Sequence, residues 1–104
     1  MKILVIRFSS IGDIVLTSPV VRCLKKHLPS AELHFLCKES MYQVVQNNPY
    51  ISHVHFFRKN DASLGEDLRK EQFDVVIDLQ KNRYSRRLVR KLLHVHRPQS
   101  LERE

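Results

Sequence analysis

The sequence contains only two glycines and four prolines among its 104 residues, too few for a collagen-like or low-complexity chain. Neither glycine-rich phosphate-binding pattern, G-x-G-x-x-G or G-x-x-x-x-G-K-[ST], occurs anywhere. Strictly apolar runs extend over only a few residues, so no transmembrane helix is expected. Residues 1–7 become polar too soon for a signal peptide, and a cytoplasmic location is therefore expected.

Cysteine is also scarce, and the histidines form no complete metal-binding pattern. Without an export signal, Cys23 and Cys37 are predicted to be buried thiols rather than a disulfide framework. The pairs His53-x-His55 and His94-x-His96 each offer two imidazoles. A zinc site normally needs three or four ligands from several elements, and nothing in the sequence completes either pair. We therefore expect no metal site and no cofactor.

Acidic residues are few, and they are unevenly distributed. Residues 1–80 contain ten lysines and arginines against nine acids, whereas residues 81–104 contain eight against two. Nearly all of the net charge of +7 therefore belongs to the C-terminal segment. Such a segment favours an anionic partner, although a solvated helix face has the same composition.

Four largely apolar segments alternate with helical patterns, and the first and fourth of them are rich in β-branched residues. The strands are predicted at residues 2–8, 32–38, 53–57 and 73–79, and the helices after them near 13–28, 39–48, 62–71 and 84–94. Pro19 leaves two possibilities open, because Ser18 can cap a helix there or Pro19 can kink one that begins near Asp13. This order predicts an α/β fold, an open parallel sheet with helices on both faces. Residues 98–104 are expected to be a frayed tail.

Ligands of such sheets gather where the strands end at their carboxyl edge. The first strand is followed by the turn Ser9-Ser10-Ile11-Gly12-Asp13, in which Gly12 permits close approach and Asp13 supplies a carboxylate. That carboxylate suits activation of a hydroxyl better than binding of a pyrophosphate, but Asp13 can equally cap the next helix. The fourth strand leads into residues 78–83, where Asp78, Lys81, Asn82 and Arg83 form a second polar loop or an ordinary connection.

The segment from Ile3 to Pro19 resembles the N-terminal signature of the lipopolysaccharide heptosyltransferases, glycosyltransferase family 9. There a strand runs into a Ser-Ser-(apolar)-Gly-Asp turn and an apolar helix with a proline, as in ILVIRFSSIGDIVLTSP here. The similarity continues through AELHFLCK, residues 31–38, and FDVVIDLQKN, residues 73–82. It therefore covers nearly the whole chain.

The resemblance implies a GT-B enzyme, of which residues 1–97 are the Rossmann-like acceptor-side domain and the C-terminal donor-binding domain is absent. It implies an inverting, metal-independent transfer of heptose from the donor ADP-heptose to the anionic inner core of lipopolysaccharide. Asp13 is then the general base, and Ser9, Ser10 and Gly12 shape the turn and contact substrate. Lys81, Asn82 and Arg83 are also expected to bind substrate, because they follow the fourth strand at the same edge of the sheet. Contact with the inner face of the inner membrane is expected, and nucleic acid is not. The 104-residue chain alone is expected to be inactive, because nothing in it stabilises the leaving group.

Two other classes of function remain as alternatives. A small basic α/β module could bind nucleic acid or another polyanion through residues 81–91, and salt-dependent binding to any polyanion would favour it. A receiver-like or structural α/β domain is disfavoured, because no acidic pair follows the first strand.

Overall fold

The computed structural model describes residues 1–95 and 99–102, with side chains described up to Leu92. Its elements alternate between strand and helix, as the sequence predicts. They are β1 (Lys2–Ile6), α1 (Ile11–Val15), α2 (Ser18–His27), β2 (Glu32–Lys38), the 3-10 turn η1 (Glu39–Met41), α3 (Tyr42–Val45), β3 (His53–Phe57), α4 (Ala62–Lys70), β4 (Val75–Asp78), α5 (Arg83–Val95) and β5 (Gln99–Glu102).

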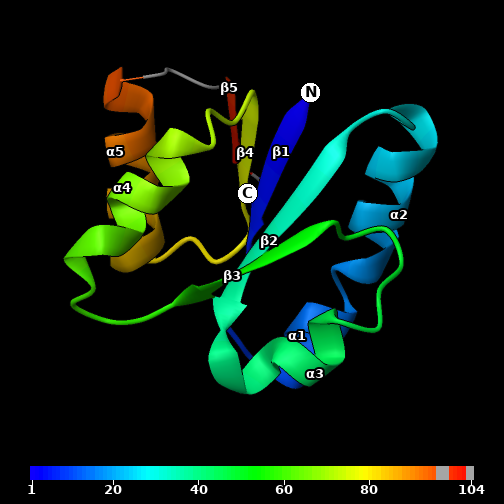
Figure 1. Ribbon diagram of the computed structural model, residues 1–104. Coiled ribbons are helices and arrows are strands. Elements are labelled where there is room, and N and C mark those ends of the chain that lie inside the picture. Colours follow the sequence, from blue (N-terminus) through cyan, green and yellow to red (C-terminus); the bar gives the residue numbers. More distant parts are fainter. Residues whose placement is uncertain (96–98, 103–104) are drawn as a thin grey trace.

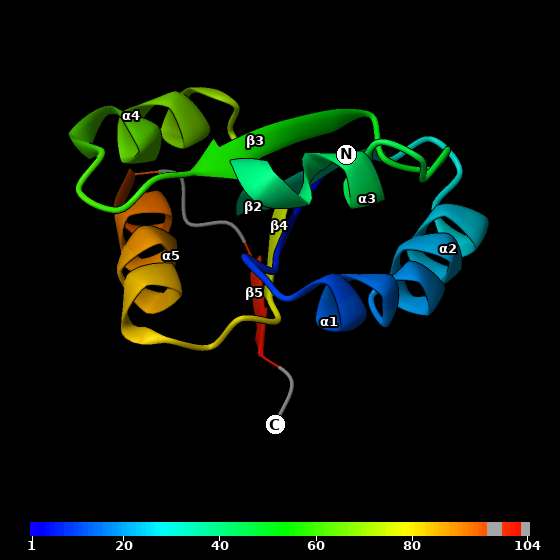
Figure 2. The same cartoon turned by 90° about the horizontal axis from the view of Figure 1, so that it is seen from below.

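The strands form one sheet in the order β3-β2-β1-β4-β5, and every neighbouring pair is parallel. Helices α4 and α5 cover one face, and α1, α2 and α3 cover the other (Figures 1 and 2). The predicted open α/β sheet is therefore confirmed. Because the chain moves outward from β1 in both directions, β1 and β4 flank the point where the strand order reverses, which is the usual ligand position in such sheets.

Alternation along β1 divides the core into two clusters. Leu4 and Ile6 face α4 and α5, whereas Ile3 and Val5 face α2 and its neighbours, and all four side chains are buried. This explains why the strand is apolar at every position from Ile3 to Ile6, as expected for a parallel strand covered on both faces. Full burial of each such side chain contributes roughly 1.5–3 kcal/mol, so the central strands hold the carboxyl edge in place.

The segment around Pro19 forms two helices rather than one. α1 ends at Val15, and α2 begins at Ser18 with Thr17 as its N-cap and Pro19 in its first turn. Of the two possibilities, a helix that starts at Pro19 is therefore nearly right. The N-cap is Thr17, one residue before the expected Ser18. A proline in a first turn removes an N–H that no helical carbonyl would accept.

Two expectations are wrong. Within the expected tail 98–104, Gln99–Glu102 form β5, whose residues pair with β4 from Val75 to Asp78; residues 96–98 and 103–104 lie outside the described part. The segment QSLE has little strand propensity, and pairing with the open edge of β4 determines its conformation. Cys37 is buried, but Cys23 is exposed, because it lies on the outward face of α2. None of the helices in the described residues is both long and apolar enough to cross a membrane.

Candidate functional site

The turn after β1 fixes the carboxylate of Asp13 through one oxygen. Oδ2 accepts a hydrogen bond from the Ser10 hydroxyl at 3.0 Å and a longer one from the Ser10 backbone N–H at 3.4 Å. Asp13 therefore closes the first turn of α1 from inside the helix, as the third residue of a capping box whose N-cap is Ser10 rather than Asp13 itself. The described residues include no hydrogen-bond partner for Oδ1, and the side chain is 47% exposed. The carboxylate is thus both a structural cap and an accessible base.

Arg7 connects this turn to the loop after β4, a role that the sequence analysis did not assign. One guanidinium nitrogen lies 2.8 Å from Asp13 Oδ2, and another donates to the Leu79 carbonyl at 2.9 Å. The Arg7 side chain is only 23% exposed, and its Nε–H is buried without a partner among the described residues. The available signal was a single cation at the end of an apolar strand, between Ile6 and Phe8, six residues before an acid.

The same contacts determine the ionisation of Asp13. Hydrogen bonds from Ser10 hold the pKa of the Asp13 carboxyl below its ordinary value, and the Arg7 guanidinium lowers it further. Each contact stabilises the charged form more than the neutral one. Asp13 is therefore ionised at neutral pH and can accept a proton.

The loop after β4 is held by Asp78 and Asn82. Asp78 is buried, and its Oδ1 accepts hydrogen bonds from the backbone N–H groups of Gln80 at 3.0 Å and Lys81 at 2.9 Å. Asn82 caps α5, since its side-chain oxygen accepts from the Ser85 N–H at 2.9 Å while the Ser85 hydroxyl accepts from the Asn82 N–H. Both side chains thus have local structural roles, and the Asn82 amide N–H groups have no partner among the described residues.

A pocket of about 430 Å³ opens where β1 to β4 end. Of the sequence-predicted site residues, Ser9 and Asn82 line it, whereas Ser10, Gly12, Asp13, Lys81 and Arg83 lie outside its wall. Its other lining residues come from all four strand ends and the first turn of α5. They are Phe8, Lys38, Glu39, Ser40, Phe57, Lys59, Gln80 and Tyr84. The pocket therefore lies at the carboxyl edge that the sequence predicts, but with a largely different wall.

Aromatic rings form one side of this pocket and carry cations. Phe57 stacks on Phe8 with ring centroids 3.9 Å apart, and Tyr84 lies 5.9 Å from Phe57. The Lys59 ammonium and the Arg83 guanidinium lie 5.5 and 5.1 Å from the Tyr84 ring centroid. Except for the contact between the adjacent residues Arg83 and Tyr84, these contacts join separate elements, so the sequence spacing gave no sign of them. Apolar faces beside cations suit a ligand that combines a C–H surface with negative charge.

Tyr84 is also affected chemically by these cations. The Arg83 guanidinium donates to the Tyr84 hydroxyl oxygen at 3.2 Å and lowers the pKa of that hydroxyl, and Lys59 lowers it further. Arg83 therefore borders the pocket through Tyr84 rather than directly. Lys81 adopts a left-handed backbone conformation with φ of 54° in the loop below.

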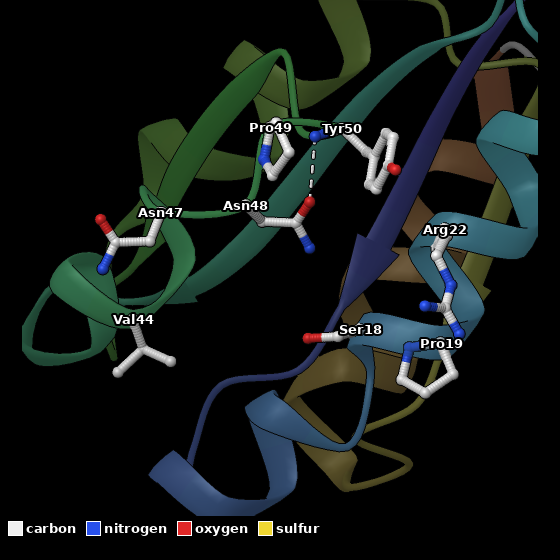
Figure 3. Close-up of a pocket in the computed structure, with 8 residues that line it drawn as sticks. All are labelled: Ser18, Pro19, Arg22, Val44, Asn47, Asn48, Pro49 and Tyr50. Carbon is white, nitrogen blue, oxygen red and sulfur yellow. Dashed lines mark hydrogen bonds between the residues drawn. The ribbon is translucent and has the colours of Figure 1, made fainter.

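A second cavity of about 360 Å³ lies between the start of α2 and the segment that joins α3 to β3 (Figure 3). Ser18, Pro19 and Arg22 form one wall, and the opposite wall includes Asn48 and Tyr50. The Asn48 side-chain oxygen accepts from the Tyr50 N–H at 2.9 Å, which fixes that turn. None of the predicted site residues lines this cavity, so we take the pocket at the strand ends as the candidate site.

Gly12 lies at an open position of α1. A Cβ at this residue would meet no atom within 4 Å, and the backbone has no positive φ there. No contact in the described part therefore requires glycine. The neighbouring apolar side chains Ile11, Val15 and Leu16 are exposed, so α1 presents an uncovered apolar ridge beside Asp13.

Comparisons with known proteins point in one direction. The sequence matches no protein-family model. It is 30% identical over 86 residues to lipopolysaccharide heptosyltransferase 1 of Campylobacter coli, covering 77% of this chain and 25% of that protein. The chain thus spans about a quarter of the length of this relative.

Solved structures share the fold. A glycosyl transferase family 9 protein from Veillonella parvula superimposes with a TM-score of 0.80 at 26% identity, over 97% of this chain and 32% of that one. The Escherichia coli ADP-heptose lps heptosyltransferase II superimposes with a TM-score of 0.82 at 22% identity, over 98% of this chain and 30% of that one. The resemblance to the lipopolysaccharide heptosyltransferases that the sequence predicts is therefore confirmed.

Proposed function

From this similarity to glycosyltransferase family 9, we propose that the chain is the acceptor-side part of an inverting glycosyltransferase. The enzyme moves heptose from ADP-heptose to the inner core of lipopolysaccharide, and Asp13 is its general base. The names of the relatives support the reaction class, and the 26% identity with a family 9 structure supports the fold assignment. The observation that carries the proposal is the carboxylate of Asp13, held by one oxygen at the strand-reversal point with the other oxygen accessible.

The proposed reaction needs one base. The acceptor hydroxyl oxygen attacks the anomeric carbon of the heptose, a new C–O bond forms, and the bond to the ADP oxygen breaks on the opposite face. The hydroxyl proton passes to Asp13, and ADP leaves with the electron pair. Because the pKa of Asp13 lies below its ordinary value, the base is weak but fully ionised. It accepts the proton as the attacking oxygen becomes acidic in the transition state.

The remaining predicted residues bind and position the acceptor. Ser9, Ser10 and Gly12 shape the turn and contact substrate, while Asn82 offers its unpartnered amide N–H groups in the pocket wall. Lys81 and Arg83 are proposed to bind the anionic groups of the acceptor. We assign the stabilisation of charge on the departing ADP to the donor-binding half of the enzyme.

The basic face of α5 supports contact with a negatively charged membrane surface. Arg86, Arg87, Arg90 and Lys91 are exposed along the helix that begins at Arg83. Each lysine or arginine near an anionic surface contributes about 1 kcal/mol of attraction. We therefore propose peripheral association with the inner face of the inner membrane, where the lipid-linked acceptor is held.

The test uses a chimaera in which this chain replaces the corresponding segment of the Campylobacter coli relative. Asp13→Asn is expected to lower turnover by roughly a hundredfold to ten-thousandfold, the usual contribution of a general base, with little change in donor affinity. Glu71→Gln, the same carboxylate-to-amide change at a residue that pairs with Lys2 at the opposite edge of the sheet, is the control. An Asp13→Asn chimaera that retains wild-type turnover would return Asp13 to a structural cap alone.

A binding experiment on the unmodified chain separates the two classes of partner. Inner-core oligosaccharide carrying its phosphates should bind more tightly than DNA of equal charge. Equal affinity for arbitrary DNA would instead support the alternative of a polyanion-binding module acting through residues 81–91.

A further inference from the structure

Three histidines gather at the amino edge of the sheet, away from the candidate active site. His34 lies in β2 and His53 and His55 in β3, with His34 paired in register to His53. All three rings stack, since the His34 ring centroid lies 4.6 Å from that of His53 and 5.1 Å from that of His55. The sequence showed only the His53-x-His55 pair. The third imidazole comes from the neighbouring strand, which spacing along the chain does not reveal.

Glu32 brings a carboxylate into the same cluster. Its Oε1 lies 2.7 Å from His34 Nε2 and 3.0 Å from His53 Nε2. The second ring nitrogen of His34, Nδ1, lies 2.8 Å from His55 Nε2. His34 is 1% exposed, whereas Glu32 and His53 are 37% and 56% exposed, so the group opens to solvent on one side.

His34 and His55, the two less exposed histidines of the cluster, favour the neutral form. Burial lowers the pKa of both His34 and His55 below the ordinary histidine value. Three stacked rings cannot all carry charge without strong mutual repulsion. The neutral ring, with a free nitrogen lone pair, is also the form that binds transition metals.

We propose that Glu32, His34 and His53 form a binding site for a transition-metal ion of the zinc class, with water in the fourth position. The ligand atoms would be Glu32 Oε1, His34 Nε2 and His53 Nε2, all within 4.8 Å of one another. A tetrahedral zinc ion with ligand bonds of about 2.0–2.2 Å needs donor atoms roughly 3.3 Å apart. The two separations that involve Glu32 Oε1, 2.7 and 3.0 Å, are slightly shorter than that spacing, and the two histidine nitrogens lie within 4.8 Å of each other.

His55 has the position of an outer-shell partner. When His34 Nε2 binds the ion, the remaining proton of the neutral ring lies on Nδ1 and can be donated to His55 Nε2. Metal-bound histidines nearly always donate their other ring N–H in this way, which fixes both the tautomer and the ring orientation. Phe73 packs edge-on against the His34 ring at 4.9 Å and restricts its rotation further.

A second group, His34, His55 and Glu71, is less suitable. Glu71 already pairs with the Lys2 ammonium at 3.0 Å, so its charge is compensated within the fold. Glu32, in contrast, contacts the imidazoles of His34 and His53, and a metal ion can bind these two rings together with the carboxylate. The site links β2 to β3, an edge strand of the described sheet, and we assign it a structural role (Figure 1).

The test measures Zn²⁺ and Co²⁺ binding to the full chain by competition with a chromophoric chelator. The background carries His94→Gln and His96→Gln, since these two histidines lie outside the residues whose side chains are described. One ion per chain is expected, with a tetrahedral Co²⁺ absorption spectrum and a rise in Tm on binding. Glu32→Gln and His53→Gln should each weaken binding by at least about tenfold and abolish the rise in Tm.

Two variants serve as matched controls. Glu71→Gln makes the same change at the competing carboxylate, and His27→Gln removes an exposed histidine elsewhere, so both should bind within about twofold of the background. Circular dichroism in chelator verifies the fold of every variant, and His53 is exposed enough for substitution without loss of core. The proposal is overturned by a background protein without saturable binding, by unchanged affinity in His53→Gln, or by loss in Glu71→Gln with none in Glu32→Gln. It is independent of the proposed transferase function.

Discussion

Replacing Arg7 by methionine tests whether this side chain holds the candidate site together. Methionine fills a similar volume but removes the guanidinium and both of its contacts. The hydrogen bond to the Leu79 carbonyl is partly buried and charge-assisted, and such bonds contribute roughly 1.5–3 kcal/mol to stability. The pair with Asp13 contributes little, because that carboxylate is solvent-exposed and an exposed pair is screened.

The free energy of unfolding in urea distinguishes these two contributions. Arg7→Met should lose about 1.5–3 kcal/mol, most of it from the Leu79 bond. For a domain of this size each kcal/mol corresponds to roughly 4–8 °C in Tm, so thermal melting gives a second measure. Asp13→Asn keeps the bond from Arg7 to Leu79 and should therefore lose far less. Equal losses in the two variants would refute the conclusion that Arg7 stabilises the fold mainly through its hydrogen bond to the Leu79 carbonyl.

Three further predictions follow from the same structure. In the chimaera, Lys81→Ala with Arg83→Ala should raise the acceptor KM and leave the donor KM unchanged, and the rise should become smaller as the salt concentration increases. An unchanged acceptor KM at low ionic strength would show that this segment is only a solvated helix face. The chain by itself should transfer no heptose in a radiolabelled donor assay, and any sugar transfer would contradict the proposed division into halves. Burial raises the pKa of the Cys37 thiol to about 11, so at pH 8 iodoacetamide should alkylate the exposed Cys23 and leave Cys37 unmodified in mass spectra; rapid double labelling would contradict this burial.

The sequence predicted the strands well because their signal is local. Short, largely apolar segments between turn residues mark β2 and β3 at their observed bounds, and alternation with helices implies a parallel sheet. The boundary between α1 and α2 was left open, because a proline can follow a capping Ser18 at the start of a helix or kink a helix that begins near Asp13. β5 was missed since its pairing with β4, and not its own composition, makes it a strand.

The candidate site was predictable only in part, for a related reason. Asp13 stands out because a carboxylate in a turn after a buried strand is visible in sequence. Arg7 and the aromatic wall of Phe57 and Tyr84 depend on contacts between elements far apart in the chain, so spacing does not reveal them. The histidine cluster was dismissed for the same reason, because β2 supplies the imidazole that completes it.

The pairing of β1 with β4 determines when this site can exist during synthesis. Ile6 lies beside Asp78, and Arg7 reaches a carbonyl 72 residues away. A nascent chain that has not yet emerged as far as β4 therefore contains α1 and Asp13 but lacks the loop after β4 that Arg7 contacts. Closing so long a loop is entropically costly and slow, and only the pairing of the strands compensates for it. The two loops of the carboxyl edge can therefore be joined only after the fourth strand has left the ribosome.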